Sequence, residues 1–388
     1  MSAAGVGFWL GVAWLGYVWI GYPLILAVVS LARRFRTLTA DDYFPAVSVL
    51  IAARNEEKDI SWKLEQTLAW DYPKDRLEVL VGSDASTDGT DDAIRSIQSP
   101  RVRFVRNEER SGKNRTLNRL ARMANGDLLF FTDANTSIEP QCLKKMVRYF
   151  ADTRVGCVTG LEHNIEGRDT STITMGSNAY LGYEAAVDML ESKLGSVLVC
   201  DGSIYCLRSS LFFSLDPDLA NDLEHPVRAG AAGAKILYEP EARSFERCSS
   251  SAREEFARRR RIAGQGALAM WRLRHELSGF RLWQFLSRKC LRWLTLIPVV
   301  MILISTFIMR RDSWFVELFA AQIAFYLVSL LGAWQGGQSR MSAVMRLPFV
   351  VVLANVAVFL GVVDACCGKT FATWNIAALS RGTGRVSG

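Results

Sequence analysis

An acidic and an amide side chain stand two residues apart where one apolar run of the chain ends. The run Leu128 to Phe131 leads directly into the segment Thr132-Asp133-Ala134-Asn135-Thr136. Hard cations such as Mg²⁺ or Mn²⁺ take one or two protein oxygens of this kind, and substrate phosphates complete their coordination. A capping or turn role explains the same triplet equally well. The residues alone therefore leave two interpretations open, a divalent-metal site at Asp133 and Asn135 or an ordinary turn.

Two other apolar runs also end in polar loops. One is followed by Ala52-Ala53-Arg54-Asn55-Glu56-Glu57, and the next by Gly82-Ser83-Asp84-Ala85-Ser86-Thr87-Asp88-Gly89-Thr90. Asp, Ser, Thr and Gly are the residues that a strand-to-helix loop needs for turning and N-capping, so Asp84 alone favours a turn.

Three further places in the chain carry charged residues that are compatible with either a ligand-binding or a structural role. Lys113, after the flexible Gly112, is either a point charge toward a diphosphate or a solvated surface lysine. Asp222 precedes a helical turn and is compatible with an N-cap. A run of four arginines, 258–261, lies in a helix with Phe256, Ile262, Leu268 and Trp271 available for an apolar side. Such a helix is typical of a lipid headgroup surface, and Arg258 and Arg261, one turn apart, could instead hold a phosphate.

Short β-rich runs alternate with helical stretches such as Glu56 to Trp70, and this alternation predicts a parallel α/β sheet. In such sheets ligands bind beyond the carboxyl ends of the strands, where the polar loops stand. The predicted strands are Val47 to Ala52, Leu77 to Val81, Val102 to Val105, Leu128 to Phe131, Val155 to Thr159 and Lys235 to Tyr238.

Uncharged segments at both ends of the chain predict membrane spans. Gly7 to Leu31 is long enough to cross a bilayer as one uncleaved helix, with a removed signal peptide as the alternative. Three runs near the lower length limit follow, Trp293 to Met309, Leu318 to Trp334 and Leu347 to Val363. Each alone is compatible with a buried core helix, but the set predicts a membrane bundle.

Basic residues predict the orientation of these spans. Arg33, Arg34 and Arg36 directly follow the first span, so the middle region faces the cytosol. Four spans place the C-terminus outside, whereas the basic residues after the last run, Lys369, Arg381 and Arg385, favour the inside. A re-entrant run or a further interfacial segment would remove this conflict.

Composition narrows the class further. The net charge of +7 suits a surface that attracts anionic lipids and phosphate-bearing substrates, and it is no evidence for nucleic acid. The eight cysteines show no metal-ligand spacing and no disulfide framework, as expected for reduced thiols of a cytosolic domain.

Together and in this order, the motifs resemble family 2 of the GT-A fold glycosyltransferases, especially membrane-bound bacterial exopolysaccharide enzymes such as cellulose and hyaluronan synthases. Asp84 matches the family's early Asp, Asp133 and Asn135 its metal motif, Asp222 its catalytic base, and Arg258 and Arg261 its Gln-x-x-Arg-Trp helix. Gly112-Lys113, Leu117-Asn118 and Gly126-Asp127 resemble the run before the metal strand. The acceptor-side segment of the family is similar to Tyr183-Glu184, Glu191-Ser192 and Gly202-Ser203-Ile204-Tyr205.

The resemblance implies a Rossmann-like GT-A domain of class α/β, cytosolic and inserted between an N-terminal transmembrane helix and a C-terminal helical bundle. The expected division is an anchor at 1–36, the GT-A domain at 37–250, basic interfacial helices at 251–292, a bundle of about three helices at 293–365 and a tail at 366–388. The enzyme is then a multi-pass protein of the cell (inner) membrane.

The resemblance also implies an inverting transfer from a nucleotide sugar, with Mg²⁺ or Mn²⁺ as cofactor and UDP-sugar as the expected donor. The base is Asp222, and the acceptor side includes Tyr183, Glu184, Gly202 and Ser203. Donor binding falls to Ala52, Arg54, Asn55, Glu56, Asp84, Lys113, Asp133, Arg258 and Arg261.

Two departures from the family pattern bear on the acceptor. Asn135 replaces a carboxylate but keeps an oxygen ligand, and Arg258 and Ile262 stand where glutamine and tryptophan are expected. The missing tryptophan face argues against processive extension. The preferred acceptor is therefore a polyprenyl diphosphate-linked saccharide at the membrane, with a growing polysaccharide as the alternative. A catalytically silent donor-binding scaffold and a transporter are the competing classes.

Overall fold

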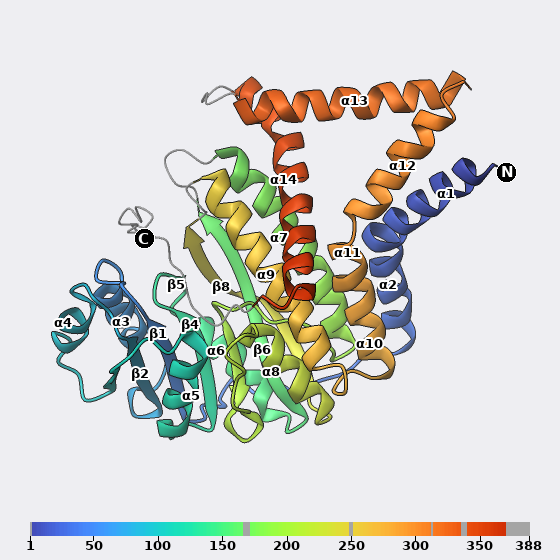
Figure 1. Cartoon of the computed structure of the whole chain (residues 1–388). Helices are drawn as coiled ribbons and strands as arrows, with labels where there is room; N and C mark the ends of the chain where they lie inside the picture. Colours follow the sequence, from blue (N-terminus) through green and yellow to red (C-terminus); the bar gives the residue numbers. More distant parts are fainter. Residues whose placement is uncertain (1, 166–170, 248–250, 312, 335–339, 370–388) are drawn as a thin grey trace.

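A computed structural model describes residues 2–165, 171–247, 251–311, 313–334 and 340–369 of the chain. It shows a sheet-containing body with apolar helices extending from one side (Figure 1). The central sheet has eight strands in the order β3-β2-β1-β4-β7-β6-β8-β5. The strands are β1 (Val47–Ala53), β2 (Leu77–Asp84), β3 (Val102–Asn107), β4 (Leu128–Asp133), β5 (Ser137–Ile138), β6 (Val155–Ile165), β7 (Tyr205–Arg208) and β8 (Lys235–Arg247).

All six predicted strands form, and each of them extends beyond the C-terminal end of the apolar run that predicted it. β1 pairs in parallel with β2 and β4, and β2 with β3, as predicted. The sheet is nevertheless mixed, because β7 lies antiparallel between β4 and β6. β7 was not predicted, since four residues of mixed character give too short a signal.

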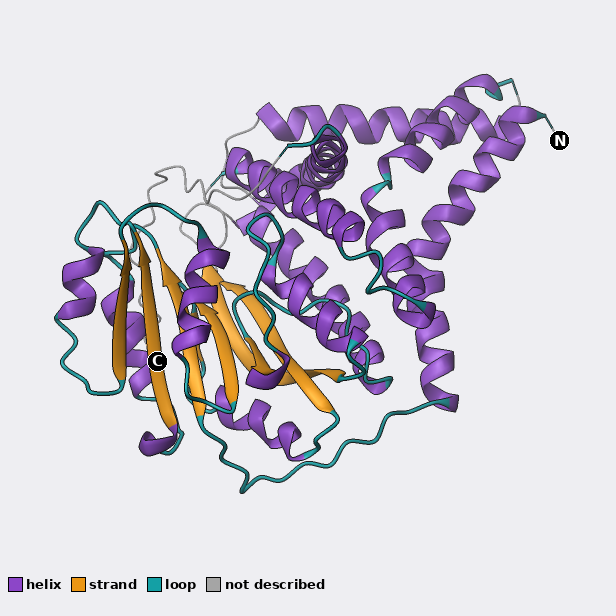
Figure 2. Cartoon of the chain, turned by 60° about the horizontal axis from the view of Figure 1, so that its bottom comes forward, coloured by secondary structure: helices purple, strands orange, loops and turns teal. Residues whose placement is uncertain are grey.

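Side chains of the sheet alternate between two buried cores, as the two-residue period of a strand requires. Val49 and Ile51 join one core, whereas Leu50 and Ala52 join the other. Figure 2 shows helices on both sides of the strands. The helices of this part are α3 (Ile60–Leu68), α4 (Thr90–Arg95), α5 (Lys113–Met123), α6 (Cys142–Val147), α7 (Ser171–Lys193), α8 (Asn221–Ala231) and α9 (Ala252–Arg272), with 3-10 turns at Lys74–Arg76, Arg148–Ala151 and Ser209–Leu211.

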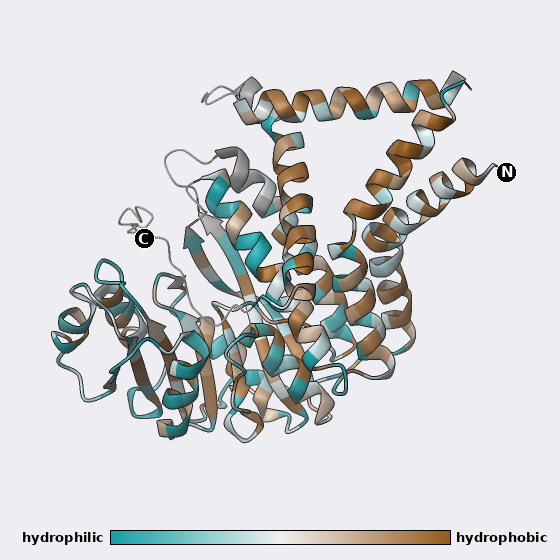
Figure 3. Cartoon of the chain, viewed as in Figure 1, coloured by the Kyte–Doolittle hydropathy of each residue, from teal (hydrophilic) through white to brown (hydrophobic). Residues whose placement is uncertain are grey.

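The apolar helices lie at the two ends of the chain, and Figure 3 shows them as its most hydrophobic part. The first, 3–32, is a 30-residue candidate span interrupted by a π turn. Its parts are α1 (Ala3–Gly16), η1 (Tyr17–Gly21) and α2 (Tyr22–Ala32). The C-terminal elements are α10 (Gly279–Phe285), η5 (Leu286–Cys290), α11 (Leu291–Trp293), α12 (Leu296–Ile308), α13 (Ser313–Trp334) and α14 (Arg340–Cys366).

Three helices of the described residues are long and apolar enough to cross a membrane, and a bent pair brings the number to four. The bent pair, Gly279–Trp293 with Leu296–Ile308, turns by 54°. In Figure 1, α13 runs across the far ends of α12 and α14 instead of alongside them. The predicted spans are therefore present, but the bundle differs from four helices packed side by side.

Helix α9 buries a different face from the one that its large apolar residues suggested. Ile262 and Trp271 are 48% and 65% exposed, whereas Ala263, Ala267 and Ala269 are buried. The small residues allow neighbouring elements to approach closely, and a Cβ on Gly266 would come within 2.5 Å of the Trp293 ring. Close packing against the membrane helices, not an apolar stripe, thus fixes α9.

Candidate active site

The carboxyl ends of β1, β2 and β4 meet at one edge of the sheet. Ala52 stands opposite Gly82 on one side and opposite Asp133 on the other. This register brings the loops after the three strands together, as the parallel arrangement predicted. The donor-side positions chosen from the sequence in these loops are therefore neighbours.

The loops after β1 and β2 clamp each other. The amide of Asn55, whose φ is +52°, donates to Ser86 Oγ at 3.2 Å, and Asn55 Oδ1 accepts from the Thr87 amide at 2.9 Å. The amide of the buried Glu56 donates to Thr90 Oγ1 at 2.8 Å. Arg54 reaches the backbone oxygen of Asp84 at 3.3 Å. Asn tolerates this left-handed backbone better than most residues, which explains its place here.

Asp84 is fully buried, and its carboxylate holds the loop before α5. One oxygen accepts from the Ser111 amide at 2.7 Å, and the other accepts from the Gly112 amide at 2.9 Å. Asn107 adds a third donor at 3.2 Å. Burial alone would raise the pKa of Asp84, but these hydrogen bonds lower it below its usual value. Asp84 does not cap α4: the N-cap is Gly89, and Asp88 accepts from the Thr90 amide at 3.1 Å.

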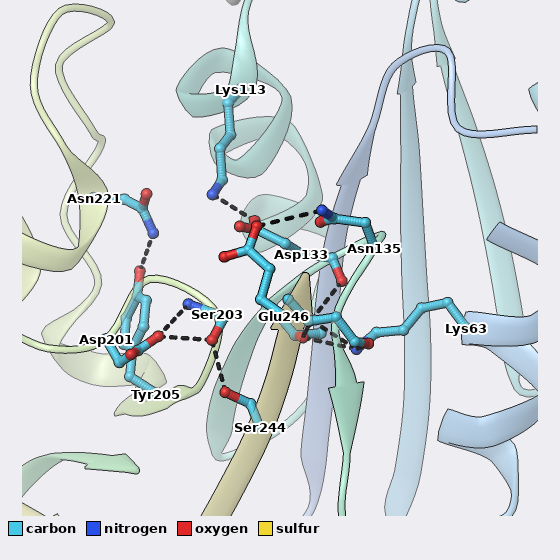
Figure 4. Close-up of polar contacts among 12 residues, drawn as sticks. Lys63, Lys113, Asp133, Asn135, Asp201, Ser203, Tyr205, Asn221, Ser244 and Glu246 are labelled. Carbon is cyan, nitrogen blue, oxygen red and sulfur yellow. Dashed lines mark hydrogen bonds and ion pairs between the residues drawn. The ribbon is translucent and has the colours of Figure 1, made fainter. Parts of the chain in front are cut away.

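The loop that Asp84 holds aims Lys113 at the predicted metal motif. Lys113 Nζ lies 2.6 Å from Asp133 Oδ1, and both side chains are half-buried. Asn135 donates through its amide nitrogen to Glu246 Oε1 at 3.3 Å (Figure 4), which leaves its carbonyl oxygen for a ligand. Among the described residues, no group of three or more His, Cys, Asp or Glu is arranged to hold a metal. The oxygens present suit a cation that takes one or two protein ligands and completes its shell with phosphates.

Asp222 lies in the first turn of α8 and does not cap that helix. The N-cap is Ala220, and the Asp222 carboxylate has no side-chain partner in the described parts of the chain. A Cβ on Gly202 would lie 3.2 Å from Asp222 Oδ2, so the predicted acceptor-side loop borders this carboxylate. Burial raises the pKa of Asp222, the charges of Lys113 and Lys289 lower it, and Asp133 raises it. The net rise favours a proton-accepting role.

Next to Asp222 stands a carboxylate that sequence reasoning missed. Asp201 accepts from Ser203 through its amide at 2.9 Å and its hydroxyl at 2.6 Å, and Ser203 continues to Ser244 (Figure 4). Burial raises the pKa of Asp201 to about 6, against the Ser203 hydrogen bonds that lower it. Burial and the charge of Asp201 also raise the pKa of Glu162 well above its usual range. The pairing of β6 with β7 brings these two carboxyls together, and the Asp201 amide donates to Thr159 Oγ1 of β6 at 2.8 Å.

Arg258 and Arg261, the two arginines of α9 that the sequence assigned to donor binding, have different partners. Arg258 lies 3.6 Å from Glu246 and 3.8 Å from Glu162. Arg261 donates only to Gln265, at 3.2 Å, and has no carboxylate within ion-pair distance among the described residues. Desolvation and the charge of Arg258 lower the pKa of Arg261, whereas the negative charges of Asp222 and Asp133 raise it. Arg261 is thus the cation of α9 that remains available to an anionic ligand near both aspartates.

The other predicted acceptor-side residues lie in the contact between α7 and the first span. Tyr183 donates to the backbone oxygen of Trp19 at 3.2 Å. Glu184 pairs with Arg288 at 3.0 Å and with Arg292 at 2.5 Å. The same cluster joins Arg288 to Asp188 and Glu191. Tyr183 and Glu184 therefore have partners in this contact, whereas Gly202 borders Asp222 and Ser203 bonds to Asp201.

Two lysines at the site also escaped sequence reasoning. Lys63 is fully buried under the Asp133 loop, and Lys289 is close enough to act on the pKa of Asp222. Lys63 occupies an amphipathic helix position that carries no motif, and Lys289 stands within a basic segment before a span. Neither has a local signal, because tertiary contacts give both their environment.

Comparisons with known proteins agree with this arrangement. Residues 48–202 match Glycosyl transferase family 2, and residues 128–356 match Glycosyl transferase family group 2. A mannosyltransferase from Pyrobaculum calidifontis, solved with GDP-Man and Mn²⁺, has a TM-score of 0.73 at 20% identity and covers 94% of this chain and 99% of its own. That likeness establishes the shared fold.

Two curated relatives match part of the chain. The beta-monoglucosyldiacylglycerol synthase of Synechocystis sp. is 34% identical over 120 residues, or 30% of this chain and 25% of that protein. The poly-beta-1,6-N-acetyl-D-glucosamine synthase of Staphylococcus aureus is 27% identical over 208 residues, or 51% and 49%. The matched part thus spans half or less of the length of these relatives.

The fold and the site define a GT-A glycosyltransferase with apolar helices at both ends of its catalytic part. The chain belongs to Glycosyl transferase family group 2, and its residues 48–202 also match Glycosyl transferase family 2, the family that the sequence resemblance indicated.

Proposed function

We propose that the protein is an inverting transferase that moves a sugar from a nucleotide-sugar donor to a membrane-associated acceptor. The observation that supports this proposal best is the Asp222 carboxylate, which has no side-chain partner among the residues that the structure describes and has a raised pKa. A group in this state is suited to take a proton from an acceptor hydroxyl.

The residues of the site take separate roles in this proposal. The clamped loops at Arg54, Asn55 and Glu56, with Ala52 beside them, form the nucleoside side of the donor pocket. Asp84 acts through the loop that it holds and thereby positions Lys113. Lys113 and Arg261 then offer positive charge to the donor diphosphate, and Arg258 acts beside them.

The transfer is a single in-line displacement. The acceptor oxygen forms a bond to the anomeric carbon as the bond to the diphosphate oxygen breaks. Asp222 takes the acceptor proton, and the nucleotide diphosphate leaves with the electron pair. Asp133, with the carbonyl oxygen of Asn135, would hold a Mg²⁺ or Mn²⁺ ion, which offsets negative charge on the leaving diphosphate when bound. UDP-sugar is the proposed donor, in line with the named product of the Staphylococcus relative, an N-acetylglucosamine polymer.

We place the enzyme in the cell membrane with its catalytic part in the cytosol, because Arg33, Arg34 and Arg36 directly follow the first span. The proposed acceptor is a polyprenyl diphosphate-linked saccharide. A membrane acceptor fits a site that stands beside apolar helices, and the Synechocystis relative is named for a lipid product.

Nucleotide release by the purified protein in lipid tests the function. The assay compares nucleotide sugars and lipid-linked acceptors with Mn²⁺, Mg²⁺ or chelator, and Asp222→Asn is the matched variant. Release that needs one donor, a metal and Asp222 supports the proposal. Donor binding without release in any combination would favour a silent scaffold, and products of many added sugars would favour a processive synthase.

A further inference from the structure

Lys289 is an unpaired cation in a crowded part of the protein. It lies in η5, the π turn directly before α11 and α12. Within the described residues it makes no hydrogen bond or ion pair, although its neighbours in the chain are paired and it is itself half-buried. π turns inside helices often mark functional sites. An ammonium left without a counter-ion in such a place is costly unless an anion arrives.

The surrounding charges do not neutralise Lys289. Arg288 forms ion pairs with Glu184 at 3.0 Å, Asp188 at 2.6 Å and Glu191 at 2.7 Å. Arg292 also forms an ion pair with Glu184, at 2.5 Å. Each of the three carboxylates is thus held by Arg288 or Arg292, and Lys289 has no carboxylate within ion-pair distance among the described residues.

The segment that carries Lys289 borders the loop beside the catalytic base. Gln284 exchanges hydrogen bonds with Ser196, and the Cys200 amide donates to the backbone oxygen of Asp222 at 2.9 Å. Lys113 and Lys289 both act on the Asp222 carboxyl, and Lys113 stands on the Asp133 side. Asp222 thus has one lysine on the donor side and another on the side of η5.

The side of η5 is the membrane side. Tyr17, in the middle of the first candidate span, bonds to Ser287 at 2.7 Å and accepts from Trp283 at 3.0 Å. Trp14 donates to the Leu291 backbone oxygen at 3.1 Å. A ligand that reaches Asp222 from the lipid therefore passes the element that carries Lys289.

We infer that Lys289 binds the diphosphate of a lipid-linked saccharide acceptor and thereby presents the sugar hydroxyl to Asp222. This inference rests on the proposed function and names its acceptor class. A phosphate on the lipid would supply the close counter-ion that Lys289 lacks, and the lipid chain would lie among the apolar helices that η5 joins. The donor diphosphate belongs to the opposite side, where Lys113 and Asp133 meet.

Two acceptors that carry the same saccharide test whether the protein recognises the diphosphate charge or only the sugar. One carries the saccharide on polyprenyl diphosphate and the other on an uncharged alkyl chain, both in nanodiscs of neutral lipid. Acceptor and donor KM values are measured for the wild type, Lys289→Met and Lys289→Arg. Lys144→Met is the control, because Lys144 is a partly buried lysine of α6 whose ammonium lies 3.8 Å from Asp71 and over the Phe44 ring.

We expect Lys289→Met to raise the KM for the diphosphate acceptor about 10- to 100-fold, the effect of losing a charge-assisted contact. At a pH above the acidic limb of both proteins, where Asp222 is ionised in each, the donor KM and the activity with the uncharged acceptor should match the wild type. Lys289→Arg should keep most of the preference for the diphosphate acceptor. An unchanged diphosphate KM in a folded Lys289→Met protein would overturn the inference. Equal loss with both acceptors would assign Lys289 a purely structural role. Absence of transfer by the wild type would instead contradict the proposed function.

Discussion

Lys63 donates a hydrogen bond to Thr132 Oγ1 at 2.8 Å from directly beneath the loop that carries Asp133. The same ammonium donates to the Thr136 backbone oxygen at 2.9 Å and to its hydroxyl at 3.3 Å. Lys63 is fully buried, and burial lowers its pKa to about 7 although Asp133 opposes the shift. A helix on one face of the sheet thus fixes both ends of the proposed metal loop.

Replacing Lys63 with Met should weaken metal activation. The change leaves three buried oxygens without their donor, at about 1 to 3 kcal/mol for each group that stays unsatisfied, and frees the loop between Thr132 and Thr136. We expect the Mn²⁺ concentration for half-maximal nucleotide release to rise about 10-fold. Thr67→Val is the control, because the Thr67 hydroxyl donates to the Lys63 backbone oxygen within α3. Lower thermal stability with unchanged Mn²⁺ dependence would show that Lys63 merely supports the core.

The rate of transfer should depend on the ionisation of Asp222. Its pKa is raised by burial and lowered by Lys113 and Lys289. Below that pKa the carboxyl is protonated and cannot accept a proton, so the rate should rise with pH and level off above it. We expect the acidic limb of kcat/KM to lie above the usual range of an aspartate. Lys289→Met should move this limb to higher pH, because the positive charge that lowers the pKa of Asp222 is lost. A limb that stays at the ordinary aspartate value would remove Asp222 from the role of base.

Sequence reasoning predicted the sheet and its loops well because both depend on local patterns. The aliphatic runs of β1, β2 and β4 are buried on both faces, and polar residues must follow where such strands leave the core. The motif positions Asp84, Asp133 and Asp222 therefore came from short segments, although their roles in transfer stay predictions.

Long-range pairing explains what the sequence did not reveal. Lys63 meets Thr132 across 69 positions of the chain, and Arg288 meets Glu184 across 104. Glu184 reads as an acceptor-side residue in its motif, yet two arginines from a distant segment hold it. Likewise, only tertiary contacts show that small residues of α9, such as Ala263 and Ala267, are buried while Ile262 is exposed.

Loss of Arg288 should destabilise the junction between the first span and the catalytic part. Arg288 is buried and pairs with three carboxylates, one of which, Glu191, also accepts a hydrogen bond from Tyr22 of α2. Arg288→Met leaves those carboxylates without their main partner, at about 3 to 5 kcal/mol. Thermal unfolding in nanodiscs should show a clearly lower midpoint than the wild type. The control is Arg274→Met, since Arg274 is exposed and bonds only to the Trp271 backbone. Equal midpoints for both variants would contradict the expectation.

The end of α14 should lie on the same side of the membrane as the catalytic part. Asp364 accepts two hydrogen bonds from Arg260 of α9, at 2.6 and 2.8 Å, and a Cβ on Gly361 would come within 2.1 Å of the Arg260 backbone oxygen. With α13 running across, the first span, α12 and α14 make an odd number of crossings, which agrees with the basic residue Lys369 after the last span. A membrane-impermeant maleimide should therefore label the exposed Cys366 and Cys367 only from the side that also labels a cysteine placed at Lys58. The double variant Cys366→Ser, Cys367→Ser gives the background, and labelling from the opposite side would mean that α13 crosses the membrane as a fourth span.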